Sequence, residues 1–358
     1  MGPFDHAAPG SWDAQPGTGK MVGSVAELWR YPVKSMRGGT VSQLLITDRG
    51  SVGDRAWALR DPTNGRIASA KRFPQLLEFR ATYEVEPTMT TSGRVRIEAP
   101  DGQSVYADEP GASELISSHL GRRLRLENQP RVDEKTGIDR RTVFGDVPVS
   151  EMKPDWTPET MPDYFQLKTG TFFEIGAVYL LGSGSVGHLR ELQGGTALID
   201  RRRFRPNIYI DTGPATDRFV EDEWIGGTLE VGGTVVLDQF QPTLWCVTST
   251  LAQEELPRDR SVLRTTAQYH SGCLGVYASV QHPGLVKVGH QVVLHGPGVA
   301  QPPSRVSGRA ARRRRSQSSS RQIPMATNSL PQEAPFQASD WSTRHQQRPA
   351  AASGHSME

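Results

Sequence analysis

Short apolar stretches, each closed by a turn signal, recur along the chain from Val22 to Leu294. Glycine (36 residues) and proline (26 residues) are so frequent among the 358 residues that long helices have little room. Turns such as residues 62–65 (Pro-Thr-Asn-Gly) and 100–102 (Pro-Asp-Gly) are typical of connections between strands. The pattern predicts a mainly β fold of the α+β type, with early strands at residues 40–47, 55–60, 66–70, 94–98 and 104–107.

A charged, proline-rich stretch at residues 127–164 divides the apolar part of the chain, and we interpret it as a linker or long loop. Residues 21–126 before it are expected to form a β-barrel-like domain, with one helix at residues 112–120 that Gly121 terminates. After the linker, residues 165–296 are expected to form a second β domain with a few helices. Its predicted strands are residues 177–181, 207–211, 228–231, 234–240, 275–280 and 291–294.

Both ends of the chain lack apolar periodicity and are predicted to be disordered. Residues 1–20 are rich in small residues and proline, and residues 297–358 are rich in proline, serine, glutamine and arginine. The last 58 residues contain nine arginines and three acidic residues, so the rest of the chain is slightly acidic. This balance argues against nucleic acid as the main partner. The run Arg312, Arg313, Arg314 and Arg315 leaves a nuclear or RNA-associated role open, although a solvated disordered tail is the favoured explanation.

Cysteine content and hydropathy set the expected compartment. Two cysteines, Cys246 and Cys273, cannot build a disulfide scaffold or a four-cysteine zinc site, so a reducing compartment is expected. No apolar run reaches the roughly 18–20 residues of a membrane helix, and the first residues have no apolar core of a secretion signal. The sequence therefore predicts a cytoplasmic protein without a membrane partner, or a nuclear one if the arginine run is a localisation signal.

A glycine-rich turn at residues 182–187 (Gly-Ser-Gly-Ser-Val-Gly) follows an apolar stretch and opens a helix. It matches the dinucleotide fingerprint G-x-G-x-x-G, which raises the hypothesis of an NAD-dependent enzyme. The acidic residue that would bind ribose, Asp200, comes slightly early, and no series of alternating strands and helices surrounds the turn. An anion site that includes Ser185 is therefore favoured over NAD, because free amides and the helix dipole attract phosphate.

A second candidate site combines residues 31–35 (Tyr-Pro-Val-Lys-Ser) with a later Gly-Asp-Arg turn. The first stretch presents the ammonium group of Lys34 and the hydroxyl of Ser35, and the turn adds the guanidinium of Arg55. These groups suit a phosphate. Each of them, taken alone, is more typical of a solvated charge or of an ion pair with Asp54 or Asp61 than of a ligand contact.

Two more candidates lie in the second domain. Arg205 and Asn207 open a predicted strand, where they either contact a polar ligand or form an exposed edge. Cys246 follows a predicted strand among apolar residues, where a cysteine is commonly a small buried hydrophobe. No protease-type signature accompanies it, so a catalytic cysteine–histidine pair is not favoured. Cys273 lies in a Ser-Gly-Cys-Leu turn and is expected to be structural.

Taken in chain order, these stretches resemble the MOSC family (molybdenum cofactor sulfurase C-terminal domain) with its preceding N-terminal β-barrel domain. The likeness extends to amidoxime-reducing and bacterial members and covers about Val22 to Leu294. It departs from amidoxime-reducing members at Leu244 and Trp245, where those have a small polar residue and an arginine. The matching stretches are residues 31–35, 53–55, 68–77, 205–207, Cys246, 256–259 and 275–280.

The resemblance implies a molybdenum cofactor (a pterin-bound molybdenum) and an oxidoreductase that removes oxygen from an N-hydroxylated small molecule. It implies that Cys246 is the metal ligand and catalytic residue, since a soft thiolate suits a metal already bound by sulfur. It also implies an electron-donor protein of the haem or flavin type, because the chain has no motif for such a group. The residues it implies as cofactor ligands are Lys34, Ser35, Arg55, Ser185, Arg205 and Asn207.

Three alternatives stay open at the level of the sequence. A persulfide on Cys246 would make the protein a sulfur carrier instead of a reductase. Within the family, pyridoxal phosphate binding is a further option. The NAD hypothesis at the glycine-rich turn completes the set.

Overall fold

The computed structural model describes residues 19–128, 172–173, 176–195, 198–215 and 217–296. The predicted linker beyond Asn128 and both predicted disordered ends lie outside these residues, apart from residues 19 and 20. The chain is mostly β, as predicted, with three α-helices among the described residues: α1 (Gly111–Leu120), α3 (Ser183–Leu192) and α4 (Ser261–His270).

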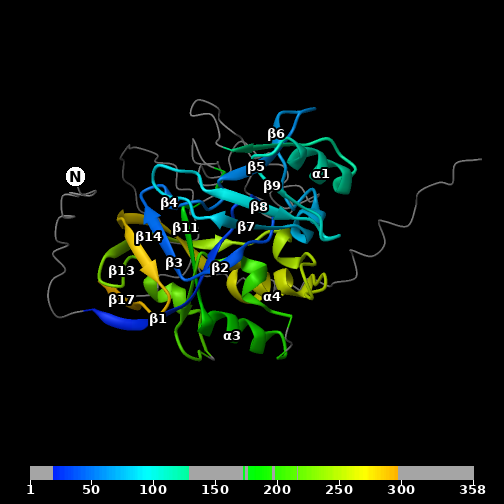
Figure 1. The fold of residues 1–358 in the computed structure, drawn as a ribbon. Coiled ribbons are helices and arrows are strands. Elements are labelled where there is room, and N and C mark those ends of the chain that lie inside the picture. Colours follow the sequence, from blue (N-terminus) through cyan, green and yellow to red (C-terminus); the bar gives the residue numbers. More distant parts are fainter. Residues whose placement is uncertain (1–18, 129–171, 174–175, 196–197, 216, 297–358) are drawn as a thin grey trace, which may run out of the picture. The chain divides into compact units, whose positions relative to one another are not determined.

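Seven strands close into a barrel in the second half of the chain, with one strand supplied from the N-terminal region (Figure 1). The seven strands, in their order around the barrel, are β12 (Ile208–Asp211), β11 (Val178–Gly182), β15 (Cys273–His282), β14 (Val235–Leu244), β13 (Thr228–Val231), β17 (Gln291–His295) and β1 (Lys20–Arg30). Strand β1 pairs with β17 on one side and with β12 on the other. The pairing of β1 with β12 therefore closes the barrel.

Strand β1 belongs by sequence to the predicted first domain, residues 21–126, and pairs with strands of the predicted second domain, residues 165–296. Although β1 opens the chain's first domain in sequence, it closes the barrel of the second. Strand β2 (Gly39–Val41) extends this sheet beside β1, and β3 (Gln43–Thr47) pairs with β16 (Gly284–Lys287) near the other end of the chain. The two halves of the chain therefore share sheets. A barrel leaves no exposed strand edge only when its first and last strands are paired, and β1 provides that pairing.

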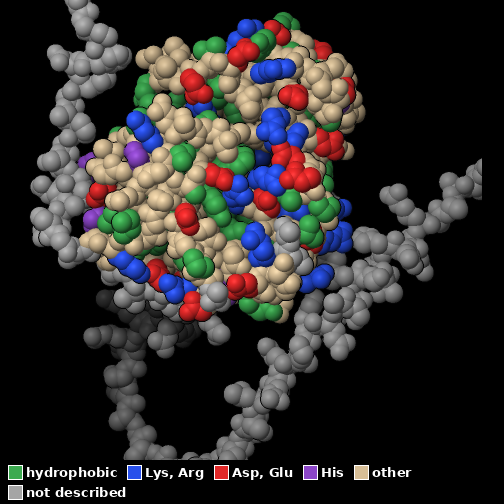
Figure 2. All heavy atoms as spheres, turned by 60° about the horizontal axis from the view of Figure 1, so that its bottom comes forward, with side chains coloured by type: hydrophobic (Ala, Val, Ile, Leu, Met, Phe, Trp, Pro, Cys, Tyr) green, Lys and Arg blue, Asp and Glu red, His purple; other side chains and the backbone are tan. Residues whose placement is uncertain are grey.

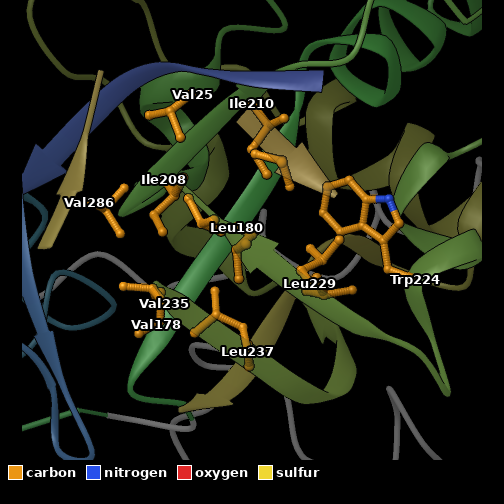
Figure 3. Close-up of a cluster of buried hydrophobic side chains, with 14 of the residues drawn as sticks. Val25, Val178, Leu180, Ile208, Ile210, Trp224, Leu229, Val235, Leu237 and Val286 are labelled. Atoms are coloured by element: carbon orange, nitrogen blue, oxygen red, sulfur yellow. The ribbon is translucent and has the colours of Figure 1, made fainter. Parts of the chain in front are cut away.

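The interior of the barrel is filled mostly by aliphatic side chains, together with one tryptophan and one phenylalanine (Figure 3). Alternate residues of each strand point inward, as the two-residue period of a strand requires. Trp224, which is 1% exposed, comes from the short 3-10 helix η5 (Val220–Trp224). Each fully buried aliphatic side chain contributes about 1.5–3 kcal/mol to folding. Those labelled in Figure 3 are Val25, Val178, Leu180, Ile208, Ile210, Leu229, Val235, Leu237 and Val286.

The rest of the N-terminal half forms small antiparallel sheets around a second apolar cluster, in which Phe79, Ile97 and Ile116 are fully buried. Helix α1 confirms the predicted helix, and Gly121 ends it in the left-handed conformation with φ of 59°. The remaining elements here are β4 (Gly50–Ser51), β5 (Trp57–Asp61), β6 (Arg66–Ile67), η1 (Pro74–Glu78), β7 (Arg80–Val85), β8 (Arg94–Glu98), β9 (Ser104–Tyr106) and β10 (Arg125–Asn128).

Two 3-10 helices connect the barrel strands beside the candidate ligands. η4 (Arg201–Phe204) leads into Arg205, and η6 (Val247–Thr250) begins directly after Cys246. Both are too short to leave a periodic pattern in the sequence. None of the helices in the described parts of the chain combines the length and the apolar character that crossing a bilayer requires.

Candidate active site

A pocket lies on the outer side of the barrel wall, beside strands β11 and β15. Val178 and Leu180 of β11 point into the barrel, so the alternation of the strand turns Tyr179 outward, and Tyr179 lines the pocket together with Tyr277 of β15. The pocket holds about 710 Å3 of space, including the part open to solvent.

Six of the seven predicted site residues line this pocket, although they come from four separate stretches of the chain. Lys34 and Ser35 follow β1, Arg55 precedes β5, and Arg205 and Asn207 precede β12. Cys246 follows β14. The first two stretches lie side by side: the amide of Lys34 donates to the carbonyl of Trp57 at 2.8 Å, and the amide of Arg55 donates to that of Tyr31 at 2.7 Å.

Three of the pocket residues hold a backbone conformation that is unusual for residues other than glycine. Ser35, Arg55 and Arg205 have φ values of 68°, 46° and 50°. Left-handed backbone costs such residues about 1–2 kcal/mol each, and it is commonly retained where a site needs it. Three of the six such residues in the described parts of the chain line this pocket, which favours a functional role for it.

The two guanidinium groups of the pocket stack on the same tyrosine. The ring of Tyr31 lies 4.7 Å from the guanidinium carbon of Arg55 and 4.2 Å from that of Arg205. Tyr31 is buried, and its hydroxyl donates to the carbonyl of Pro206 at 3.3 Å. Burial raises the pKa of Tyr31, although both arginines oppose that shift. A neutral ring thus positions two cations by cation–π contact.

Asp54 connects the two halves of the site from beneath the pocket. Its carboxylate is buried and accepts hydrogen bonds from the Tyr31 amide at 2.8 Å and from the Asn207 side-chain amide at 3.0 Å. It also pairs with Arg55. One negative charge therefore offsets part of the positive charge of Lys34, Arg55 and Arg205, and the remaining excess is positive.

Asn207 and Ser35 make bonds that position the site. The side-chain oxygen of Asn207 accepts from the Tyr179 amide at 3.2 Å, and its nitrogen donates to Asp54 and to the Trp29 carbonyl. Asn207 thus ties β1 to β11. The Ser35 hydroxyl oxygen accepts from the Ala70 amide at 3.0 Å, which leaves the hydroxyl hydrogen able to donate to a ligand.

Cys246 lies at the start of η6, where its thiol is 3.3 Å from the hydroxyl of Thr248. The second cysteine is placed differently: Cys273 pairs with Leu244 in the β14–β15 ladder, and it is not among the residues that line the pocket. Only Cys246 of the two cysteines lines the pocket. Lys34, whose ammonium donates to the Phe172 carbonyl at 2.9 Å, is buried in the same pocket.

Sequence reasoning missed the aromatic wall of the pocket. Trp245, noted only as a departure from the family pattern, is buried against Tyr179 and Phe204 at ring distances of 5.6 and 5.1 Å. Its indole nitrogen donates to the Leu274 carbonyl at 2.9 Å. The signal in the sequence was weak, because these rings come from distant stretches. The aromatic residues of the wall are Phe172, Phe173, Tyr179, Phe204, Trp245 and Tyr277.

Ser185, the seventh predicted residue, is corrected by the structure. It is fully buried and does not line the pocket. Its hydroxyl donates to the carboxylate of Glu221 and accepts from the Val220 amide at 2.8 Å. The amide of Gly182 donates to Glu221 as well, at 2.6 Å. The negative group at this helix N-terminus is therefore a side chain of the protein itself, and the turn is closed to an external phosphate.

The same contacts predict the outcome of an NAD titration. Burial raises the pKa of Glu221, although the bonds from Gly182 and Ser185 lower it, and the carboxyl group fills the place that a pyrophosphate would need. We expect isothermal titration with NAD or NADH to show no binding in the micromolar range. Micromolar binding that a Gly182→Val substitution removes would contradict this assignment.

Comparison with protein families gives two adjacent matches. Residues 22–127 match the MOSC N-terminal beta barrel domain, and residues 169–293 match the MOSC domain. The chain belongs to the MOSC family. The pocket of this MOSC protein takes residues from both matched regions, because Lys34, Ser35 and Arg55 lie in the first and Arg205, Asn207 and Cys246 in the second.

Curated relatives of this MOSC protein are named as amidoxime-reducing. It is 24% identical over 307 residues to the human mitochondrial amidoxime-reducing component 1, covering 77% of this chain and 84% of that protein. It is 26% identical over 308 residues to the bovine mitochondrial amidoxime reducing component 2, covering 76% and 83%.

Solved structures give weaker likenesses. The YUAD protein from Bacillus subtilis is 11% identical with a TM-score of 0.38, covering 78% of this chain and 98% of its own. YiiM from Geobacillus stearothermophilus is 20% identical with a TM-score of 0.25, covering 34% and 55%. Neither adds to the description of the fold or of the site.

Proposed function

We propose that this protein is an oxidoreductase that binds a molybdenum cofactor and reduces N-hydroxylated small molecules, such as amidoximes or hydroxylamines. The observation that carries the proposal is the convergence of Lys34, Arg55, Arg205 and the Cys246 thiol in one pocket. The family membership and the names of the curated relatives support the same activity.

The donor set of the pocket fits such a cofactor. A terminal phosphate is recognised by charge-assisted hydrogen bonds, and the guanidiniums held over Tyr31 can provide them without the entropy loss of a free side chain. Lys34 adds a third positive charge, and the Ser35 hydroxyl adds a neutral donor. The Cys246 thiol supplies the soft ligand that a thiolate-bound metal prefers. When bound, the cofactor would supply two-electron redox chemistry to the substrate.

The chain's own residues would bind and orient the cofactor and shield the pocket from water. The cations would bind the anionic end of the cofactor, and Cys246 would fix its metal end next to Thr248. The aromatic wall would exclude water from one side of the pocket. Reduction of an amidoxime consumes two electrons and two protons and releases an amidine and water. Those electrons would come from a partner protein of the haem or flavin type, since two cysteines cannot bind an iron–sulfur cluster of the four-cysteine type.

The decisive experiment uses the full chain expressed in a host that makes the cofactor. We expect purified protein to contain molybdenum and pterin in equal amounts and to reduce benzamidoxime to benzamidine with reduced methyl viologen as the electron source. Absence of molybdenum and pterin would contradict the proposal. If cyanide instead released sulfur from Cys246, the protein would be a sulfur carrier.

A further inference from the structure

One carboxylate outside the pocket binds three arginines that come from both halves of the chain. Glu254 accepts from Arg37 at 3.0 Å and from Arg202 at 2.7 Å, and it also pairs with Arg80. Its side chain is 20% exposed, so the pairs are partly shielded from water. On the face shown in Figure 2, basic and acidic side chains lie close together. A carboxylate shared by three guanidiniums differs from an ordinary surface pair, because one substitution removes three ion pairs at once. Arg202 would keep its pairs with Asp200 at 2.9 Å and Glu255 at 2.7 Å.

Glu254 lies at the tip of a tight turn in the segment that begins with the candidate metal ligand. We call residues 246–257 the thiol segment. Within it, Gln253 and Leu256 exchange backbone hydrogen bonds at 3.0 and 2.9 Å, and Glu254 between them has a φ of 50°. A non-glycine residue in this conformation costs free energy, and the three ion pairs of its side chain offset that cost.

A buried arginine holds the base of the same segment. Arg203 is fully buried and donates to the carbonyls of Leu251 at 3.0 Å and Pro257 at 2.7 Å. Leu251 in turn packs against Ala70 and Leu77 of the N-terminal half. The base of the thiol segment is therefore fixed by buried bonds. Its tip is held by the three ion pairs of Glu254 and by one exposed pair of Glu255 with Arg202.

Two of the three arginines connect the tip to segments that carry pocket cations. Arg37 is three residues beyond Lys34, and Arg202 is three residues before Arg205. Arg80 opens β7 in the N-terminal half. One carboxylate therefore links the thiol segment to the segments of Lys34 and Arg205. From this geometry we infer that Glu254 is a positioning residue that sets where Cys246 lies relative to Lys34 and Arg205. The identity of the pocket's ligand rests on the proposed function, whereas the positioning of Cys246 by Glu254 does not depend on it.

The neighbouring glutamate provides a matched control. Glu255 also lies on the turn, but its side chain is 68% exposed and pairs with Arg202 only among the contacts that the structure describes. Glu254→Gln and Glu255→Gln remove the same charge with the same change of shape. An effect of net charge or of salt alone would be equal in the two variants. A positioning role of Glu254 predicts an effect in Glu254→Gln only.

The test is hydrogen–deuterium exchange of the full chain, read by mass spectrometry in peptides covering the thiol segment. In Glu254→Gln we expect the amides of Leu251, Gln253 and Leu256 to exchange about tenfold faster, since local opening becomes easier. Exchange in β13 and β17 should not change, and Glu255→Gln should match the unsubstituted protein. Equal acceleration in the barrel strands would show global destabilisation, and unchanged exchange in the segment would show no role. Either result overturns the inference.

A second measurement follows the thiol itself, in a Cys273→Ser background that leaves one cysteine. Glu254→Gln should raise the rate of alkylation of Cys246 by iodoacetamide several-fold, while Glu255→Gln should not. An unchanged rate beside faster exchange would restrict Glu254 to its own turn and overturn its role at the thiol. If Glu254→Gln does not fold, Arg80→Gln can replace it, because it removes one of the three ion pairs of Glu254. It should raise both the exchange rates and the alkylation rate, by a smaller factor. Molybdenum content, measured in parallel, tests the proposed function separately.

Discussion

Cys246→Ser is expected to lower amidoxime reduction by more than about 100-fold, while leaving the protein folded. Loss of groups that merely support a metal ligand costs about 10–100-fold, so loss of the ligand should exceed that. Serine keeps nearly the volume of cysteine but replaces a soft thiolate by a hard, protonated hydroxyl. The cations of the pocket are unchanged, so part of the pterin should remain bound. The measurements are reductase turnover, molybdenum and pterin content, and the spectrum of the metal.

Cys273→Ser is the matched control, since it makes the same chemical change at a thiol outside the pocket. We expect turnover and metal content within about threefold of the unsubstituted protein, as for a surface substitution away from the site. Cys273 follows Gly272 at the start of β15, where serine is also tolerated. Equal losses in both variants, or a loss in Cys273→Ser alone, would contradict the assignment of Cys246.

The mainly β fold could be predicted because turn signals are local. The Pro-Asp-Gly turn and the Gly121 helix end are each decided by a few neighbouring residues, and β8 and α1 are found close to where those signals place them. The role of β1 could not be predicted in this way, because closing a barrel depends on pairing between residues such as Val25 and Ile210 that are far apart in sequence.

Helix α4 was missed for a different physical reason. Its buried face consists of Val262, Thr265 and Thr266, so it has no apolar stripe at helical spacing. The strand before the thiol was predicted to end at Phe240 but continues to Leu244, through Pro242, with register shifts along the β14–β15 pair. Proline normally breaks a ladder, and irregular pairing is what admits it.

The candidate site was largely predictable, since its residues carry charge or a thiol in short motifs. Motif order brought together Lys34, Ser35, Arg55, Arg205 and Cys246, which the structure places in one pocket. The failure at Ser185 has a specific cause. Whether a helix N-terminus is free depends on what packs against it, and the carboxylate of Glu221 comes from a residue 36 positions later in the chain.

Asp54 was treated in the sequence only as a partner for neighbouring charges, yet its substitution should have the largest effect on stability. Its side chain is inaccessible to solvent, and it receives three hydrogen bonds, from Tyr31, Arg55 and Asn207. Asp54→Ala removes all three at once. The buried amide of Tyr31 and the side-chain amide of Asn207 then lose their acceptor, and the guanidinium of Arg55, which is 16% exposed, loses its carboxylate.

We therefore expect Asp54→Ala to lower the free energy of unfolding by about 3–5 kcal/mol, the usual cost of removing one partner of a buried ion pair. For a domain of this size, that corresponds to a fall of about 10 °C in the midpoint of thermal unfolding. Asp217→Ala, at a side chain that is 74% exposed beside Arg218, should move the midpoint by less than about 2 °C. Calorimetry of Asp54→Ala and Asp217→Ala tests this expectation. Equal midpoints of thermal unfolding in the two variants would mean that other contacts hold Arg55 and Asn207. Arg55 and Asn207 both line the pocket. Asp54→Ala should therefore also weaken binding of the pterin at temperatures where the protein is still folded. Pterin content measured at such a temperature separates damage to the site from unfolding of the protein.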